Sequence, residues 1–373
     1  GEYFYERGNF YFNMNNLKRS FADISRAIEL NPDEAGYYMA RGNVKMFLGN
    51  FVGAFEDMNK AIEIDATNVF YYIGRANARK MFKDYSGALA DFNTAIKLDP
   101  EESNLYTMRA NFKYNLGDYE GCLKDYNKAV ELDPENPTNY VLRAPIKMGF
   151  GDPEGALADY DKAIELDPED DILYNLRAIT KEGMEDDIGA IEDFSKAIEL
   201  DPENADYYYS RALAKSNLEG SEVPLNDYDR AVELDPLNDE FHYGRALALQ
   251  QQENYIDALE DLDDAIALDE NNDLYYFSRA ILKKKFDDID GALADLDKAI
   301  VLDPKNDDYY FERAITYGDN GYYKESLKDL DRAIELAPKE AEYYYERGLI
   351  KENLSDFTGA GKDFEKAFKM DPK

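Results

Sequence analysis

SNLYTMRANFKYNLGDYEGCLKDYNKAVELDPEN, residues 103–136, is one copy of a 34-residue pattern that recurs along the whole chain. Each copy closes on a variant of KAIELDP, such as the one at 162–168. A strict period of this length is typical of proteins built from stacked copies of one small unit. Without insertion or deletion, the copies begin at residues 1, 35, 69, 103, 137, 171, 205, 239, 273, 307 and 341.

Each copy is predicted to form two helices. In the quoted copy, the first helix covers 103–116 and the second covers 120–132, with GDY turning the chain between them. Tyr126 and Val130 lie on one face of the second helix at helical spacing. DPEN then ends this helix, because proline cannot continue a helix and also restricts the residue before it.

Small and aromatic side chains occupy fixed places, which we count as positions 1 to 34 within a copy. Position 8 is always Gly or Ala, and position 27 is Ala in every copy. Position 4 is aromatic except in the copy that carries His242. Small side chains at these places allow the two helices of a copy to approach each other closely.

This arrangement resembles the tetratricopeptide repeat family, whose pattern has an aromatic residue at position 4, small residues at 8, 20 and 27, and proline at 32. The resemblance covers the whole chain. It implies an all-α fold, namely a right-handed superhelical solenoid of eleven helix-turn-helix hairpins that runs as a single continuous domain over residues 1–373. The first helices would line its concave face.

The chain departs from the family pattern in two regular ways and two local ones. Position 7 is Arg in every copy, and position 11 is mostly Lys. Pro145 falls inside a predicted first helix and Pro224 inside a predicted second helix. We expect each proline to kink or shorten its helix, because each removes an internal hydrogen bond.

The most regular polar pair joins Arg at position 7 to Asp at position 23. Arg109 and Asp125 are one example, and every copy has both residues. Both face the seam between the two helices, where a partly buried charge needs a partner and a guanidinium suits a carboxylate. We expect a ladder of structural ion pairs; the alternative is that these residues bind a ligand.

The composition bears on partners and location. A net charge of −36 repels nucleic acid, so we expect no nucleic-acid partner, and it favours basic proteins or cations. No apolar run is long enough for a membrane span, which predicts a soluble protein without membrane insertion. The single cysteine, Cys122, excludes an intrachain disulfide. Cytoplasmic and secreted or cell-surface locations are both compatible with this sequence.

No group of residues predicts chemistry, so we expect a protein that is not an enzyme and that holds no cofactor and no metal. His242, the only histidine, occupies an aromatic position and is expected to pack rather than to bind a ligand. Cys122 occupies a small-residue position and is expected to be a buried apolar side chain. The acidic cluster at 167–171 lacks the ordered spacing of a calcium loop and is expected to be solvated surface.

Position 9 varies between copies, and variation within a strict repeat marks a place where a ligand could bind. It is Asn in the first four copies, and each side-chain amide offers a donor and an acceptor to an extended peptide. Asparagine ladders occur in several peptide binders of the resembled family; simple solvation of the groove is the alternative. The basic residues of that family's carboxylate clamp are missing at position 5, so a C-terminal carboxylate is not the expected ligand.

In the later copies, position 9 is apolar and position 5 is mostly aromatic. This predicts an apolar strip along the groove or, alternatively, side chains that pack internally. The candidates for a peptide groove are therefore Asn9, Asn43, Asn77, Asn111, Tyr209, Tyr243, Phe277, Phe311 and Tyr345.

The two ends of the chain look like interior copies without a neighbour, and terminal units of solenoids are normally polar. Contacts between such ends are head to tail and grow into a filament unless they close into a ring. The residues expected at this end-to-end interface are Tyr3, Phe4, Phe10, Tyr11, Phe357, Phe364, Phe368 and Met370.

The sequence thus predicts a scaffold for protein–protein interaction that self-assembles head to tail into a homo-oligomer, filament or tube. The alternative is an adaptor that binds an extended or basic peptide in the concave groove. Residues 137–272 carry −25 of the net charge, so salt or divalent cations are expected to promote assembly by screening.

Overall fold

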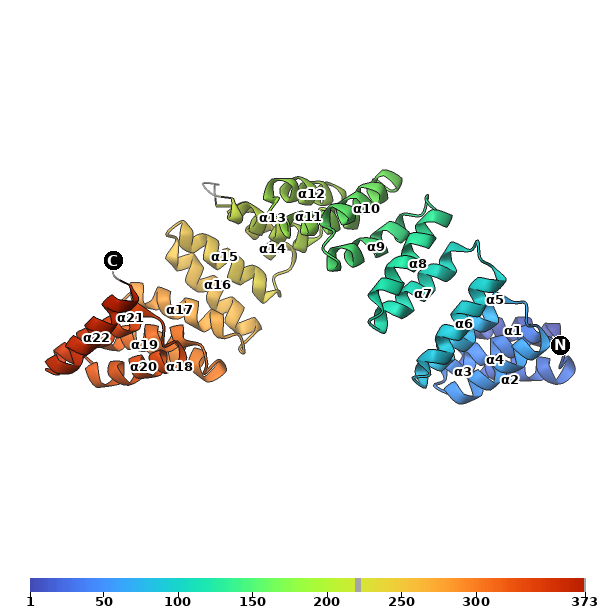
Figure 1. Cartoon of the computed structure of the whole chain (residues 1–373), viewed down its shortest axis with the longest axis horizontal. Coiled ribbons are helices and arrows are strands. Elements are labelled where there is room, and N and C mark those ends of the chain that lie inside the picture. The colour runs from blue at the N-terminus through green and yellow to red at the C-terminus, as the bar shows by residue number, and fades with distance from the viewer. Residues whose placement is uncertain (219–222, 372–373) are drawn as a thin grey trace. The chain divides into compact units, whose positions relative to one another are not determined.

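The computed structural model describes residues 1–218 and 223–371, and within these ranges all regular elements are α-helices (Figure 1). First and second helices alternate along the chain. The first helices are α1 (Glu2–Asn13), α3 (Ala35–Phe47), α5 (Val69–Met81), α7 (Ser103–Asn115), α9 (Pro137–Gly149), α11 (Asp171–Glu182), α13 (Ala205–Asn217), α15 (Asp239–Gln251), α17 (Asp273–Lys285), α19 (Asp307–Asp319) and α21 (Ala341–Asn353). The second helices are α2 (Leu17–Leu30), α4 (Phe51–Ile64), α6 (Tyr85–Leu98), α8 (Tyr119–Leu132), α10 (Pro153–Leu166), α12 (Asp187–Leu200), α14 (Leu225–Leu234), α16 (Tyr255–Leu268), α18 (Ile289–Leu302), α20 (Tyr323–Leu336) and α22 (Phe357–Met370).

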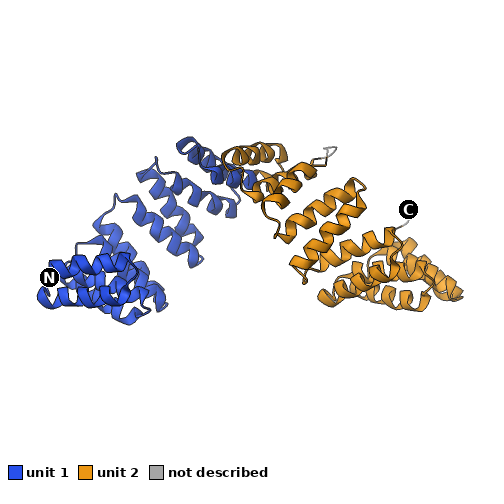
Figure 2. Ribbon diagram, turned by 180° about the vertical axis from the view of Figure 1, so that it is seen from behind, with its two compact units in different colours: residues 1–180 blue, residues 181–373 orange. Residues whose placement is uncertain are grey.

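The chain divides into two compact units, residues 1–180 (unit 1) and 181–373 (unit 2), coloured blue and orange in Figure 2. Successive helices pack against each other within a unit, as α7 packs against α8 and α8 against α9 in unit 1, and α19 against α20 and α20 against α21 in unit 2. First helices of successive pairs also touch, as α1 touches α3 and α3 touches α5. This arrangement of tandem helix pairs confirms the all-α solenoid class predicted from the 34-residue period.

A left-handed residue at position 15 joins the two helices of a pair. Every position 15 that the structure describes has a positive φ, and four of them are glycines. In the copy around Gly117, the N–H of Asp118 donates to the carbonyl of Lys113 at 3.0 Å and closes α7. The side chain of Asp118 then accepts from the N–H of Gly121 at 2.9 Å and caps α8. Only three residues therefore separate the end of α7 from the start of α8.

The seam between the helices of a pair is narrow. Ala at position 27 has no exposed surface from Ala27 to Ala333. A Cβ added to Gly8 would lie 2.5 Å from Cγ1 of Ile24, so a side chain at this residue would displace Ile24. These contacts explain why the small residues recur at the same positions.

The predicted ladder of ion pairs crosses this seam. In the ten pairs named below, the guanidinium donates through Nε and Nη2 to both carboxylate oxygens of its aspartate, at 2.6 to 3.0 Å. The expectation of structural pairs is thus confirmed for Arg7–Asp23, Arg41–Asp57, Arg75–Asp91, Arg109–Asp125, Arg143–Asp159, Arg211–Asp227, Arg245–Asp261, Arg279–Asp295, Arg313–Asp329 and Arg347–Asp363.

The lysines at position 11 belong to the same ladder. The ammonium of Lys113 lies 2.8 Å from Oδ2 of Asp125, and Lys45 lies 2.7 Å from Asp57 in the same way. The buried carboxylate therefore has two cationic partners. This accounts for the departure from the family pattern at position 11.

From Arg75 onward, the ladder also links a helix pair to the preceding one. Nη1 of Arg75 donates to Oδ1 of Asn59 at 2.8 Å, and Nη1 of Arg279 donates to Oδ1 of Asp263 at 2.7 Å. Both acceptors stand at position 25 of the preceding copy. Each such arginine therefore fastens three helices together.

The two prolines have different effects. Pro224 takes the N-cap position of α14, which has 10 residues where α16 has 14, so the predicted shortening is confirmed. α9 passes through Pro145 and has 13 residues, as α7 has. Of the two effects expected of Pro145, a kink or a shortening, the shortening does not occur, because the helix continues for four residues beyond the ring.

Candidate functional site

A pocket of about 330 Å³ opens on the first helices at the N-terminal end of unit 1. Asn9 and Asn43, one helix pair apart, both line it. Within the part of the chain that the structure describes, no hydrogen bond engages either side-chain amide, so both can serve a ligand. The other residues that line this N-terminal pocket are Tyr5, Phe12, Ile24, Gly36, Met39, Ala40, Val44, Asn68, Phe70 and Tyr71.

The walls of the N-terminal pocket are held by local contacts. The ring of Tyr5 lies 4.7 Å from that of Tyr37, between centroids, which fixes one side. Phe12 packs against the core around Ile24. Asn68 caps α5 by accepting from the N–H of Phe70 at 3.0 Å, and the ring of Phe70 is 69% exposed. The pocket thus combines two available amides with an apolar rim that reaches the solvent.

The other two asparagines of the predicted ladder lie outside the N-terminal pocket. Asn77 is exposed on α5. Asn111, on α7, accepts a hydrogen bond at 2.5 Å from the hydroxyl of Tyr126. The structure therefore brings together two of the four amides that sequence reasoning selected.

The aromatic groove candidates of unit 2 stack between successive helix pairs. Tyr209, Tyr243, Phe277 and Phe311 stand at position 5, and each ring lies 4.6 to 4.9 Å from the ring at position 3 of the next copy. They are partly buried, whereas the equivalent Tyr345 on α21 is 50% exposed.

Sequence reasoning missed the polar half of this junction. The hydroxyl of Tyr275, at position 3, donates to Oδ2 of Asp239, at position 1 of the preceding copy, at 2.6 Å. Tyr309 and Tyr343 reach Asp273 and Asp307 in the same way. The signal that could have found these bonds is that every copy with Asp at position 1 is followed by a copy with Tyr at position 3.

The candidates for end-to-end contact are divided between α1 and the last two helices. On α1, Tyr3 and Phe10 are exposed, whereas Phe4 packs partly against the core. Arg19 lies over the ring of Tyr11, 5.6 Å from its centroid. Phe357, Phe368 and Met370 are exposed on α22, and Phe364 is partly buried.

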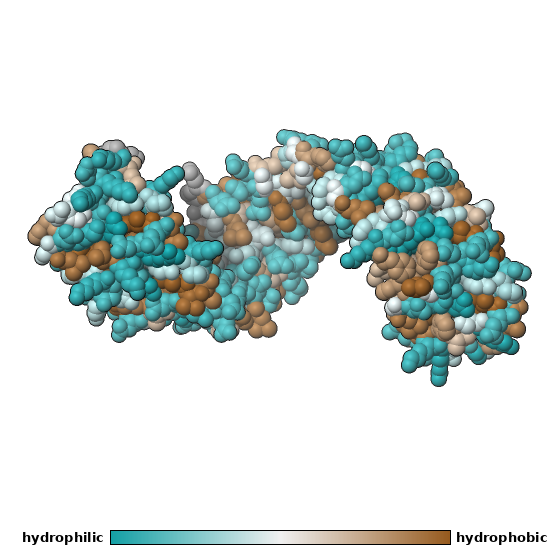
Figure 3. Space-filling model, turned by 60° about the horizontal axis from the view of Figure 1, so that its bottom comes forward, coloured by the Kyte–Doolittle hydropathy of each residue, from teal (hydrophilic) through white to brown (hydrophobic). Residues whose placement is uncertain are grey.

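A hollow of about 610 Å³ lies between α21 and α22. Its apolar lining includes Tyr345, Leu349, Phe364 and Phe368. On the face that Figure 3 presents, hydrophobic surface likewise occurs in separate patches among hydrophilic side chains.

Comparisons with protein families match this chain in seven stretches. A family described as TPR repeat matches residues 188–218. Families described as tetratricopeptide repeat match residues 1–34, 35–68, 103–136, 138–170, 225–273 and 311–373. The chain is a tetratricopeptide repeat protein.

Three solved structures are similar to this chain, and the first of them supports the fold. The C-terminal part of a tetratricopeptide repeat protein from Cytophaga hutchinsonii is 17% identical, with a TM-score of 0.55 over 64% of this chain and 98% of that chain. A tetratricopeptide repeat protein from Parabacteroides merdae is 19% identical, with a TM-score of 0.46 over 66% and 98%. Yeast Tom70 is 21% identical, with a TM-score of 0.43 over 99% and 84%. Curated protein sequences give no match.

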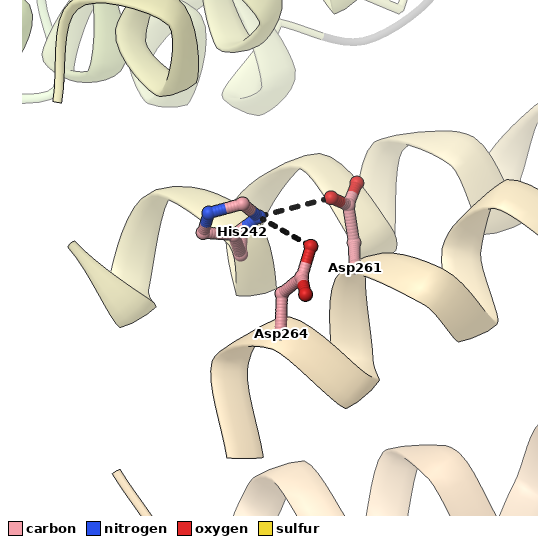
Figure 4. A group of neighbouring side chains, drawn as sticks. All are labelled: His242, Asp261 and Asp264. Carbon is pink, nitrogen blue, oxygen red and sulfur yellow. Dashed lines mark hydrogen bonds and ion pairs between the residues drawn. The ribbon is translucent and has the colours of Figure 1, made fainter. Parts of the chain in front are cut away.

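His242 of this tetratricopeptide repeat protein takes over the role of a tyrosine. Its Nε2–H donates to the carbonyl of Pro236 at 3.1 Å, as the hydroxyl of Tyr276 donates to Glu270 at 3.2 Å one copy later. Its Nδ1–H donates to Oδ1 of Asp261 at 3.1 Å, and Asp264 lies 3.8 Å away. Figure 4 shows the imidazole of α15 facing these two carboxylates of α16.

These three side chains could in principle hold a metal, because their ligand atoms lie within 4.8 Å of one another. Arg245, however, already binds both oxygens of Asp261, at 2.6 and 2.8 Å. The hydrogen bond to Asp261 raises the pKa of His242, which favours an imidazolium between the carboxylates. The arrangement is therefore suited to ion pairing within the ladder.

Two further observations limit the chemistry of the tetratricopeptide repeat protein. Cys122 is buried, and burial raises the pKa of its thiol to about 11, so the reactive thiolate is scarce at neutral pH. In the described ranges, no helix combines the length and the apolar character that crossing a bilayer requires.

Proposed function

We propose that this protein is a non-enzymatic scaffold that binds an extended, basic segment of a partner protein along the first helices of unit 1. The observation that carries this proposal is the N-terminal pocket, which gathers two available amides inside an apolar rim. An extended peptide has an N–H and a C=O at each residue, and the asparagine side chain offers a match for both.

The geometry favours a peptide over a small molecule. Asn9 and Asn43 repeat with the period of the helix pairs, as a ligand with a repeating backbone requires. Tyr5, Phe12 and Phe70 provide apolar surface for the side chains of such a segment. The net charge of −36 selects basic segments and repels nucleic acid.

Binding of short random-sequence peptides on an immobilised array would test the proposal. We expect Lys- and Arg-rich sequences to be retained, and the double variant Asn9→Ala, Asn43→Ala to lose most of this binding. Asn271→Ala, which removes an exposed amide of unit 2 outside this row, is the matched control and should bind like the natural protein. Equal retention by the double variant would contradict the assignment of the N-terminal pocket.

Head-to-tail self-association is a second candidate function, and it rests on a different observation. Within unit 2, the ring of Tyr343 at position 3 stacks on Phe311 at position 5 of the preceding copy, 4.6 Å between centroids. Tyr345 at position 5 is half exposed beside the hollow of α21 and α22, and Tyr3 at position 3 is 66% exposed on α1. We propose that Tyr3 of a second copy stacks on Tyr345 as Tyr343 stacks on Phe311.

Light scattering over a range of concentrations tests this second candidate. We expect the mass to rise with concentration and with added Mg²⁺ or NaCl, because screening lowers the repulsion between acidic chains. Tyr345→Asp should abolish the rise, while Tyr322→Asp, at an exposed ring on another surface, should not. A constant monomer mass under all conditions would exclude self-association.

A further inference from the structure

An aromatic slot of about 260 Å³ lies in unit 1 between the helix pairs α7–α8 and α9–α10. The rings of Tyr114 and Tyr119 meet edge to face, 5.5 Å between centroids, and each is 50% exposed. Phe150 lines the slot beside them. Pro145 and Ile146 of α9 also line it, and Gly149 completes it.

Gly149 leaves this aromatic slot open. A Cβ built on Gly149 meets no atom within 4 Å, and its backbone needs no left-handed conformation. A side chain at this residue would therefore have room, and none is present. Among the described residues, no lysine or arginine lies over the ring of Tyr114 or Tyr119.

The same place in another copy holds a lysine. Tyr255 and Lys285 stand four periods after Tyr119 and Gly149, at positions 17 and 13 of their copies. The ammonium of Lys285 lies 4.6 Å from the centroid of the Tyr255 ring and 3.5 Å from its hydroxyl oxygen. The electron-rich face of a tyrosine attracts a cation at this distance. The chain thus contains its own example of an occupant for this position.

We infer that the aromatic slot binds the ammonium of a lysine side chain supplied by the partner peptide. This inference rests on the proposed function, and it names one side chain that the partner must carry. Pro145 stands at position 9, in the same row as Asn9 and Asn43 on the first helices of unit 1. A segment that follows this row therefore passes from available amides to the slot.

The charge of the chain favours this occupant over an anion or a neutral side chain. The copy that contains Pro145, residues 137–170, carries a net charge of −5, and the whole chain carries −36. A cation gains from this field, whereas an acidic side chain is repelled. A neutral aliphatic side chain would gain only the apolar contact.

The test uses fluorescently labelled oligolysine and the same peptide with every lysine acetylated, followed by fluorescence anisotropy at constant ionic strength. We expect the acetylated peptide to bind more weakly, because acetylation removes the charge. Gly149→Lys places an internal lysine over Tyr119, as Lys285 lies over Tyr255, and should weaken oligolysine binding roughly threefold to tenfold. Tyr119→Leu keeps the slot apolar, and should have an effect of the same size.

Asn115→Lys is the control for charge, because it adds a lysine at position 13 of the preceding copy, outside the slot. It should bind oligolysine more tightly than Gly149→Lys does. Circular dichroism would verify that all variants keep their helices. Equal binding of the two peptides, or unchanged binding by both slot variants, would overturn the inference.

The outcome separates this inference from the proposed function. If the double asparagine variant loses peptide binding and the slot variants do not, the N-terminal pocket stands and the slot fails. If the slot variants weaken binding and the asparagine variant does not, the slot stands without the amide ladder.

Discussion

At position 15, a single backbone angle sets the geometry of every described helix pair. Glycine fills this position at 49, 117, 151 and 321, but the structure also places Lys83, Glu185 and Glu253 there with φ of 60° to 62°. A side chain with a Cβ pays about 1–2 kcal/mol for this conformation. All described copies therefore adopt the same backbone conformation at position 15, but its energetic cost differs with the residue found there.

We predict that Glu253→Gly raises the free energy of unfolding by up to about 1 kcal/mol. Glycine relieves the backbone strain at positive φ in the folded state, and this gain is partly offset by the greater entropy of the unfolded chain. Glu253→Gln is the control, since it removes the same charge and keeps the Cβ. Gly117→Ala should destabilise by about 1 kcal/mol for the opposite reason. Urea unfolding followed by circular dichroism measures all three. A Gln variant as stable as the Gly variant would indicate that charge, not backbone strain, is the cause.

A second residue-scale prediction concerns His242. Its folded pKa is raised by the hydrogen bond to Asp261, and Arg245 and Asp264 are the other charged groups that face it. The resulting stabilisation is fully present below the ordinary histidine pKa of about 6.5 and is lost as the pH rises through the raised value. The melting temperature of the natural protein should therefore fall as the pH rises across this interval.

His242→Tyr restores the residue that most other copies have at position 4 and should remove this part of the pH dependence. Differential scanning fluorimetry from below pH 6 to above pH 8 compares the two proteins. Parallel curves for the natural protein and the variant would show that His242 does not carry the effect.

At the scale of the helix pair, the sequence predicted the ion pair between positions 7 and 23. It did not predict the bonds to the preceding copy or the part played by lysine at position 11. Arg and Asp at fixed positions of one copy identified the bond across the seam, because a strict repeat points to partners inside a copy. From Arg75 onward, a further bond of the arginine crosses to the preceding copy, as from Arg279 to Asp263, so no pattern within one copy indicates it. Lysine at position 11 looked like a departure from the family, yet Lys283 binds Asp295 at 2.7 Å.

The two prolines and the N-terminal pocket also show where prediction from the sequence stops. Pro224 shortened α14 as its chemistry requires, whereas α9 accommodated Pro145. Helical propensity alone cannot decide between these outcomes, because the neighbouring helices also contribute. Likewise, the sequence places Asn9 and Asn111 at the same position of their copies. Only the structure shows that the side chain of Asn111 already accepts a hydrogen bond from the hydroxyl of Tyr126.

We predict that Arg313→Ala destabilises its helix pair more than Arg279→Ala does. Asp295 keeps Lys283 when Arg279 is removed, whereas position 11 of the other copy is Tyr317, so among the described residues Asp329 is left without a basic partner. A buried carboxylate without a partner costs about 3 kcal/mol or more. Hydrogen exchange of the amides in α19 and α20, against those in α17 and α18, measures the difference. Equal exchange in the two variants would mean that Lys283 does not stabilise Asp295 when Arg279 is absent.

For the whole molecule, a net charge of −36 opposes the compact state. We predict that the melting temperature rises as NaCl is added at low ionic strength, and rises further with Mg²⁺, because screening acts on exposed charges that lie apart. The ladder is largely buried and is screened less. An equal concentration of a neutral solute is the control, and a melting temperature that falls with salt would show that surface ion pairs outweigh the repulsion.

The arginine bond that joins a helix pair to the one before it, from Arg75 onward, has a consequence for how such a gene can change. Because the junctions from Arg75 onward use the same residue positions, recombination that adds or deletes one whole coding period among them joins an arginine to an equivalent acceptor. An insertion of any other length separates the two and breaks a junction. Unequal crossover can therefore lengthen or shorten such an array while each surviving junction keeps its bonds.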